Sequence, residues 1–113
     1  MLFSEYFLYY VLYIMSVEDY LASLPNDTTE IDISGRGLTV LPDLSRFNDI
    51  VVLNCSNNDL KTLNGLPQCI DTIYCTKNPS LKITQVPHDL LTLYCNRNQL
   101  TSGLKVKRIV LSS

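Results

Sequence analysis

Residues 50–103 read IVVLNCSNNDLKTLNGLPQC, IDTIYCTKNPSLKITQVPHD and LLTLYCNRNQLTSG when new lines begin at Ile50, Ile70 and Leu90. Four columns of these lines align without gaps, and their members are Ile50, Ile70 and Leu90; Leu53, Ile73 and Leu93; Cys55, Cys75 and Cys95; and Asn58, Asn78 and Asn98. A looser copy runs from Thr28 to Asp49, and a half copy follows the last line with Val106, Ile109 and Leu111. A fixed short period of this kind predicts a repeat protein whose coils stack on one another.

Each line begins with a short segment rich in apolar residues, which predicts a short β-strand. Side chains alternate between the two faces of a strand, so the fourth and sixth columns point to one face and the third and fifth to the other. The fourth and sixth columns are apolar, and we expect them to face inward. One coil cannot bury its apolar face alone, whereas stacked coils share a continuous core. The sequence therefore predicts an α/β repeat fold, a solenoid of about four repeats with a parallel sheet.

The columns resemble the leucine-rich-repeat family, whose signature is LxxLxLxxN/CxL. The matching segments are Leu53-Asn54-Cys55 through Leu60, Ile73-Tyr74-Cys75 through Asn78, and Leu93-Tyr94-Cys95 through Leu100. The short period and the segments Leu41-Pro42, Leu66-Pro67 and Val86-Pro87 look like the compact 20-residue class, which occurs in bacterial effectors and in short proteins of giant DNA viruses. The likeness covers residues 28–111 and departs from the pattern at Arg36, which replaces Asn, and at Leu81, which comes one residue late. It implies a leucine-rich-repeat solenoid whose concave strand face commonly carries binding.

We expect one domain in 113 residues, divided along the repeats. Residues 28–49, 50–69, 70–89 and 90–105 form the repeats, and residues 106–111 form a partial one. Before them, residues 16–27 are expected to form a helical cap and a turn, because Ser16 is a typical N-cap residue, acidic residues follow it, and Pro25 ends the helix. A solenoid needs such caps, since its ends would otherwise expose core and strand edges.

Residues 1–15 read MLFSEYFLYYVLYIM, a hydrophobic and aromatic segment whose role the sequence leaves open. The segment is shorter than the about 20 apolar residues that span a bilayer, and it lacks the basic region and small-residue cleavage site of a signal peptide. Three interpretations are open. The segment is a helix lying on a membrane or a partner, a helix folded onto the solenoid end, or a stretch outside the working protein, with translation starting at Met15.

The inward column Cys55, Cys75 and Cys95 is interpreted as structural, because free cysteine behaves as a small apolar residue in protein cores. Burial on an apolar face would raise the pKa of these thiols and lower their reactivity. A metal or redox role and a disulfide between neighbouring strands are the alternatives. Unpaired thiols favour a reducing, intracellular compartment such as the cytoplasm. Cys69 lies off the column and is expected to be partly exposed. With one histidine and no CxxC pair, we expect no metal site and no cofactor.

The column Asn58, Asn78 and Asn98 is also interpreted as structural. Stacked amide side chains can satisfy backbone groups that are left unpaired where each strand turns away, and buried backbone polar groups need such partners.

Charge is distributed unevenly along the chain, although the net charge is only −2. Residues 1–49 hold eight acids and two bases, a balance of −6, and residues 50–113 hold three acids and seven bases, a balance of +4. An elongated molecule would therefore have an acidic end and a basic end. The net charge does not favour nucleic acid as a partner. The basic cluster Lys105, Lys107 and Arg108 is expected to protect an edge strand from pairing with another chain, with a phosphate contact as the alternative.

The outward strand positions and the turns beyond them provide the candidate binding residues. These are Tyr74, Tyr94, Asn54, Lys77, Arg97, Glu30 and Asp32. Tyr74 and Tyr94 occupy the same column, so we expect their rings to stack on the open face. Aromatic residues flanked by Lys and Arg are typical of interface hot spots, so the expected partner is another protein. Cross-strand packing is the alternative role of the pair.

We expect no enzymatic activity. His88 is the one candidate base at neutral pH, and the sequence contains no nucleophile elbow, Gly-rich phosphate loop or HExxH motif. The favoured function is a protein-protein interaction module, or scaffold, that binds through the concave strand face. The alternative is a membrane-attached or structural repeat protein, or the remnant of a longer one, with no specific ligand.

Overall fold

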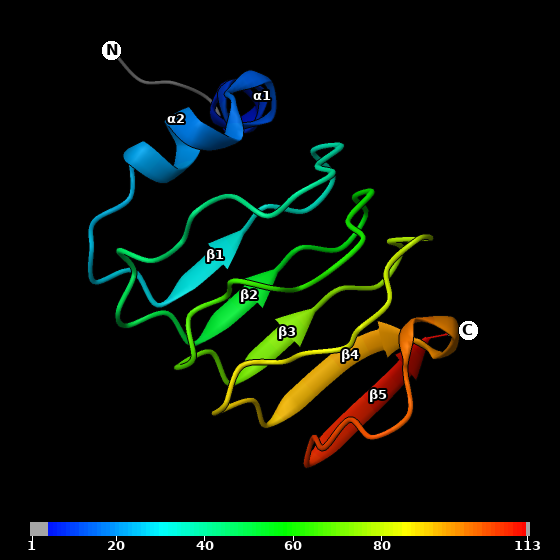
Figure 1. Ribbon diagram of the computed structural model, residues 1–113. Helices are drawn as coiled ribbons and strands as arrows, with labels where there is room; N and C mark the ends of the chain where they lie inside the picture. Colours follow the sequence, from blue (N-terminus) through cyan, green and yellow to red (C-terminus); the bar gives the residue numbers. More distant parts are fainter. Residues whose placement is uncertain (1–4, 113) are drawn as a thin grey trace.

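Five short strands form one parallel sheet in chain order (Figure 1). The computed structural model describes residues 5–112, without the side chains of residues 8, 9 and 11–13. The strands are β1 (Glu30–Asp32), β2 (Val52–Asn54), β3 (Thr72–Tyr74), β4 (Thr92–Asn96) and β5 (Arg108–Ser112). Leu53 pairs with Ile73 and Ile73 pairs with Leu93, so these two turns of the coil each advance the chain by one full repeat. The predicted solenoid of about four turns with a parallel sheet is confirmed.

Between strands the chain returns through turns and irregular backbone. Neighbouring coils exchange backbone hydrogen bonds there as well. The N–H of Asp59 donates to the carbonyl oxygen of Leu38 at 2.8 Å, and the N–H of Lys82 donates to that of Lys61 at 3.2 Å. These bonds satisfy polar backbone groups that stacking removes from water. Each coil is therefore fixed to the next both within the sheet and away from it.

A short helix, α2 (Val17–Ala22), covers the N-terminal end of the solenoid. The Oγ atom of Ser16 accepts a hydrogen bond from the backbone N–H three residues later, which is the N-cap that the sequence predicts. Val17 and Leu21 are buried in the common core. The guanidinium of Arg46 donates to the carbonyl oxygen of Leu21, so a residue of the first coil closes the other end of the helix.

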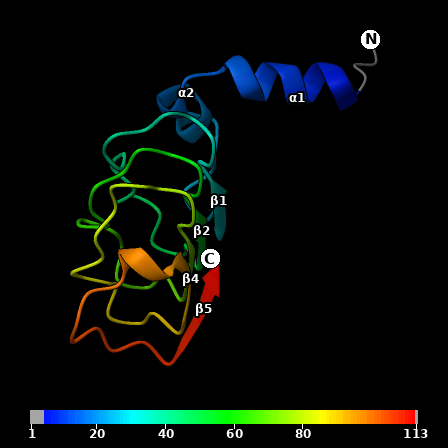
Figure 2. The same ribbon diagram turned by 90° about the vertical axis from the view of Figure 1, so that its right-hand side faces the viewer.

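A second helix, α1 (Glu5–Ile14), precedes the cap and projects away from the solenoid (Figure 2). Its side chains Tyr6, Tyr10 and Ile14 are exposed. No helix within residues 5–112 is both long enough and apolar enough to cross a membrane. The hydrophobic segment is thus helical over α1, and the solenoid end is covered by α2.

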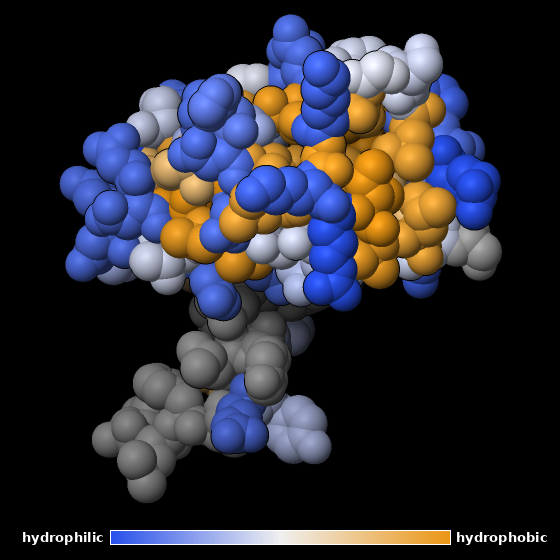
Figure 3. Space-filling view, turned by 90° about the horizontal axis from the view of Figure 1, so that it is seen from below, coloured by the Kyte–Doolittle hydropathy of each residue, from blue (hydrophilic) through white to orange (hydrophobic). Residues whose placement is uncertain are grey.

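The C-terminal end of the solenoid exposes part of its core. Ile109 and Leu111 on β5 lie in register with Leu93 and Cys95 on β4. The β4 pair is fully buried, whereas Ile109 is 37% exposed and Leu111 is 40% exposed, because within residues 5–112 no further coil stacks on β5. Figure 3 views the molecule from this end and shows hydrophobic residues gathered there.

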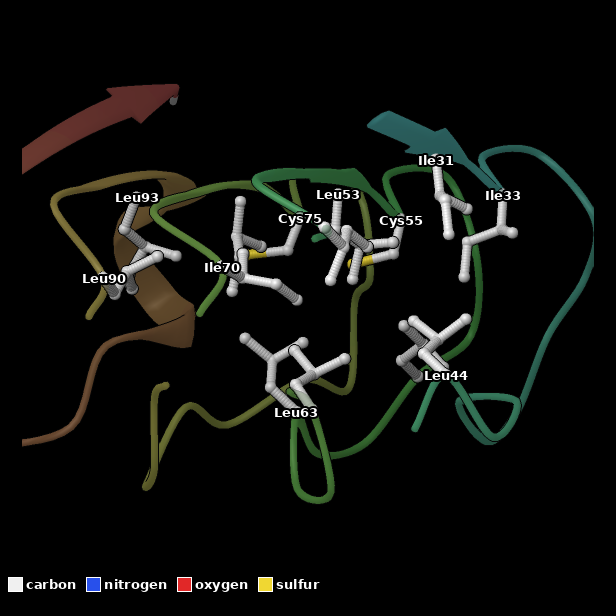
Figure 4. Packing of buried hydrophobic residues seen from close by; sticks show 14 of the residues in the cluster. Ile31, Ile33, Leu44, Leu53, Cys55, Leu63, Ile70, Cys75, Leu90 and Leu93 are labelled. Carbon is white, nitrogen blue, oxygen red and sulfur yellow. The ribbon is translucent and has the colours of Figure 1, made fainter. Parts of the chain in front are cut away.

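The core lies between the sheet and the returning segments. Figure 4 shows Leu53, Cys55 and Cys75 pointing from the strands toward Leu44 and Leu63 on the returning side. The fourth and sixth columns of the repeat are buried, as the alternation predicts, and the first column is buried as well. Burying one Leu or Ile side chain stabilises a fold by about 1.5–3 kcal/mol, so the repeated columns supply the main stabilising term.

Candidate functional site on the strand face

The outward side chains of the five strands form one surface, called here the strand face. Register pairing arranges these residues in two rows across the sheet. The first row is Glu30, Val52, Thr72, Thr92 and Arg108, and the second row is Asp32, Asn54, Tyr74, Tyr94 and Val110. All ten residues are exposed or half-buried, while the residues between the rows on β1 to β4 are buried. Five of the seven predicted binding residues therefore share this face.

The two tyrosines stack on one another, as their common column predicts. Their ring centroids lie 4.2 Å apart with an interplanar angle of 12°. The side chain of Tyr74 is 36% exposed, and that of Tyr94 is half-buried. Hydrogen bonding with Tyr94 is the largest factor that raises the pKa of Tyr74, and the carboxylate of Glu30 adds a smaller contribution. The pair is a preformed aromatic surface on β3 and β4.

A groove of about 460 Å³ lies between α2 and the first three strands. Its lining includes Tyr20, Glu30, Asp32, Val52, Asn54 and Tyr74. The carboxylate of Asp32 accepts hydrogen bonds from the N–H of Ser34 at 2.9 Å and from its Oγ at 2.6 Å. Asn54 occupies the same place on β2, and its Oδ1 accepts a hydrogen bond from the N–H of Ser56 at 3.1 Å. The turns after β1 and β2 thus each orient the last side chain of the strand before them.

Lys77 and Arg97 lie in the turns after β3 and β4 and are exposed, so they are not members of the two rows. Lys77 has a φ of 57°, in the left-handed region that lysine rarely adopts. Asn57 has the same φ one coil earlier. The N–H of Lys77 donates to Oδ1 of Asn96 at 2.7 Å, which helps to hold this backbone geometry.

Two of the three asparagines in the column, Asn58 and Asn78, connect neighbouring coils through side-chain hydrogen bonds. The Nδ2 atom of Asn58 donates to the carbonyl oxygens of Ile33 and Cys55 at 3.0 Å each, and its Oδ1 accepts from the N–H of Leu38 at 2.9 Å. Asn78 makes the equivalent contacts one coil later. Both side chains are buried, and each connects the backbone of two neighbouring coils.

The assignment of Asn98 to this column is wrong, because its side chain is exposed. The buried residue is Gln99, whose Nε2 donates to the carbonyl oxygens of Cys75 at 2.9 Å and Asn78 at 3.2 Å. The strand β4 has five residues instead of three, and a 3₁₀ turn (Arg97–Gln99) follows it. This lengthening moves the inward amide one residue along the chain, and the longer glutamine side chain reaches the carbonyl oxygen of Cys75, as Asn78 reaches that of Cys55 one coil earlier.

The column of Cys55, Cys75 and Cys95 is buried and its thiols are free. Burial raises the pKa of the Cys55 thiol to about 12 and also raises the pKa of Cys75 and Cys95. Such thiols are poor nucleophiles, which agrees with a packing role. Cys69 is half-buried, as predicted, and its Sγ lies 3.4 Å from the carbonyl oxygen of Asn48.

Two residues of the site are not among the predicted binding residues. Arg108 is expected on a protective edge strand, yet the register of β5 puts this residue in the first row with Glu30. Tyr20 is expected only in the helical cap, yet this residue lines the groove beside β1. The last coil is shorter than the two before it. Its strand β5 therefore brings Arg108 opposite Thr92, where a full repeat would bring a later residue into register. The angle at which α2 packs on the solenoid cannot be read from the repeat pattern. The repeat therefore predicts neither the position of Tyr20 nor that of Arg108.

The chain was compared with models of known protein families and with curated proteins, and neither comparison gave a match.

Proposed function

We propose that this chain is a protein-protein interaction module of the compact leucine-rich-repeat class, and that it binds its partner through the strand face. The observation that carries the proposal is the Tyr74–Tyr94 stack, with centroids 4.2 Å apart on the third and fourth of five strands. The class is supported by the repeating sequence columns and by the parallel coil that they build.

Stacked tyrosines suit binding because each offers a large apolar area with few rotatable bonds. A partner that covers them removes water from the rings without having to order flexible side chains. The groove beside Tyr74 gives a second, concave feature for a protruding partner side chain. Tyrosine hydroxyl groups add hydrogen bonding at the same place.

The tyrosine pair also contributes to the sheet, by about 0.5–1.5 kcal/mol for a stacked aromatic pair. The sheet itself does not depend on aromatic residues at this position, because Asp32, Asn54 and Val110 hold the same row on the other strands. A purely structural role therefore leaves unexplained why the two rings sit on the open side.

The proposed module acts without a cofactor and without catalysis of its own. Its inward thiols are buried with raised pKa values, and His88 is exposed next to Asp89 at 3.0 Å, outside the two rows. We propose that the module works in a reducing compartment, because the cysteines of the inward column, Cys55, Cys75 and Cys95, are packing residues with free thiols.

The test is an affinity capture from a lysate of the natural cell with three forms of the full chain. They are the wild type, Tyr74→Ser/Tyr94→Ser, and Tyr6→Ser/Tyr10→Ser, which removes two exposed rings from α1 as a matched control. The proposal expects a partner that the wild type and the control retain and that the strand-face variant loses while it still unfolds cooperatively. A partner retained by all three forms would place the binding site elsewhere.

Attachment through α1 is a second candidate function, favoured by the exposure of Tyr6, Tyr10 and Ile14 on that helix. Helices with exposed aromatic and aliphatic residues bind at membrane interfaces. Co-flotation of the full chain with phosphatidylcholine vesicles, lost in Tyr6→Ser/Tyr10→Ser, would support it. A chain that stays at the bottom of the gradient would rule it out for this lipid.

A further inference from the structure

We infer that the strand face recognises an extended peptide segment of its partner, with a basic side chain over β1 and an acidic side chain over β5. The inference rests on the proposed function, because it concerns the same face and specifies the kind of segment that fits there.

Opposite charges stand at the two ends of the strand face. The strand β1 contributes the exposed carboxylates of Glu30 and Asp32, and β5 contributes the exposed guanidinium of Arg108. Register pairing links Glu30 to Arg108 through the neutral residues Val52, Thr72 and Thr92. In the second row, the residues that follow Asp32 are also neutral, and the tyrosine pair lies among them. The face therefore has a charge polarity with an aromatic middle, and a partner of matching polarity fits in one orientation.

These end charges are open to a ligand. Among residues 5–112 the side chains within salt-bridge distance of one another are those of His88 and Asp89, which belong to neither row. The hydrogen bonds from Ser34 orient the carboxylate of Asp32 and leave its negative charge in place.

The acidic end is shaped for a guanidinium or ammonium group. The groove there combines the carboxylates of Glu30 and Asp32 with the rings of Tyr20 and Tyr74. A cation gains from both, through charge-assisted hydrogen bonds to carboxylates and through attraction to aromatic rings. The guanidinium of Arg36 already lies 5.0 Å from the ring centroid of Tyr20, so a ligand cation gains chiefly from the two carboxylates and from Tyr74.

The spacing of the two ends sets the length of the segment. Four inter-strand steps of about 4.8 Å separate β1 from β5, which makes roughly 19 Å. An extended chain covers that distance in about six residues at roughly 3.3 Å per residue. The matching segment thus has Lys or Arg and Asp or Glu about six positions apart, with apolar residues between them to cover the tyrosine rings. Segments with like charges at both positions meet repulsion at one end of the face.

Selection from a displayed library of random dodecapeptides tests this inference on the folded full chain. The wild type should enrich peptides that carry one base and one acid about six positions apart. Glu30→Lys/Asp32→Lys makes both ends of the face basic and should enrich peptides with two acids instead. Arg108→Glu makes both ends acidic and should enrich peptides with two bases. A peptide selected on the wild type should bind each of these two variants at least tenfold more weakly.

The control Asp27→Lys/Asp49→Lys changes the net charge of the chain as much as the β1 variant does, but at exposed positions outside the strand face. It should enrich the same peptides as the wild type. Glu30→Lys alone serves if Asp32→Lys disturbs the turn that Asp32 orients, and Arg108→Glu tests the opposite end independently.

Enriched peptides without the charge pair, an identical selection on the control and the β1 variant, or no enrichment on the wild type would overturn the inference. The variant Tyr74→Ser/Tyr94→Ser tests the proposed function separately from the charge polarity. If that variant enriches the same charged peptides with unchanged affinity, the aromatic centre is wrong while the charge polarity stands.

Discussion

The side-chain amide of Asn78 donates to the carbonyl oxygen of Cys55 at 3.1 Å, one coil before its own. The same nitrogen donates to the carbonyl oxygen of Cys75 at 3.1 Å, so a single buried side chain joins two coils. We predict that Asn78→Ala lowers the free energy of unfolding by about 3 kcal/mol, because buried backbone groups lose their partners. Urea unfolding of the full chain measures this change.

Asn98 supplies the matched control for that measurement. It is an asparagine at the same column of the next repeat, but its side chain is exposed. Asn98→Ala should change stability by less than about 0.5 kcal/mol, as is usual for surface substitutions. Equal losses in Asn78→Ala and Asn98→Ala would mean that the side chain of Asn98 is buried as well, which would contradict its exposed position.

Gln99 should behave as the true member of the amide column. Its Oε1 accepts a hydrogen bond from the N–H of Asn96 at 2.7 Å, in addition to the two carbonyl oxygens that its Nε2 contacts. Gln99→Ala should therefore lower the free energy of unfolding by about 2–3 kcal/mol. Gln99→Glu keeps the size but loses the donor group, so it should destabilise at neutral pH too. Unfolding curves that match the wild type would refute this role.

The stability of the chain should fall at alkaline pH because of its buried thiols. Burial raises the pKa of Cys55 from 9.0 to about 12. A group with a raised folded-state pKa contributes stability that is complete below its unfolded pKa and is lost as the pH rises toward the folded value. For this thiol the loss accumulates between pH 9.0 and about 12, where the thiol of the unfolded chain is ionised and the buried thiol is still protonated. Cys55→Ala should show a shallower decline in urea unfolding across this range, and equal slopes would count against burial as the cause.

The tyrosine pair should be visible in a pH titration. The pKa of Tyr74 is raised, chiefly through hydrogen bonding with Tyr94. Tyr94→Phe keeps the ring and removes the hydroxyl, so the pKa of Tyr74 should fall toward its ordinary value. NMR of tyrosine labelled with ¹³C at Cζ follows Tyr74 in both proteins. An unchanged titration curve would show that the hydroxyl groups do not interact.

The open C-terminal end should tolerate substitution better than the interior. Leu53 is fully buried, whereas Leu111 is 40% exposed, although it lies in register with the inward residue Cys95. Leu53→Ala should lower the free energy of unfolding by about 3 kcal/mol, and Leu111→Ala by about 1 kcal/mol or less. A large loss in Leu111→Ala would mean that another surface covers this end in solution.

Much of the fold could be predicted from the sequence because each apolar column is repeated. Leu53, Ile73 and Leu93 recur at one spacing, and a strand in register is the arrangement that buries all three together. The cap could also be predicted, since Ser16 acts locally on the backbone of its own helix.

The deviations arise where a coil changes its geometry. The fourth coil extends its strand to Asn96, so the alignment of Asn98 with Asn78 no longer gives equal burial. The same coil is shortened before β5, and only the register of that strand places Arg108 opposite Thr92. A constant repeat length predicts the same coil geometry in every repeat. The longer strand and the shortened coil both lie between the start of β4 and the start of β5.

Site-specific photo-cross-linking in the natural cell tests strand-face binding most directly. A photoreactive amino acid would replace Asn54 or Thr92 on the strand face, and Lys61 or Thr84 on exposed turns away from it. We predict that the same partner cross-links from positions 54 and 92 and not from positions 61 and 84. Cross-links that form only from the two turn positions would contradict it.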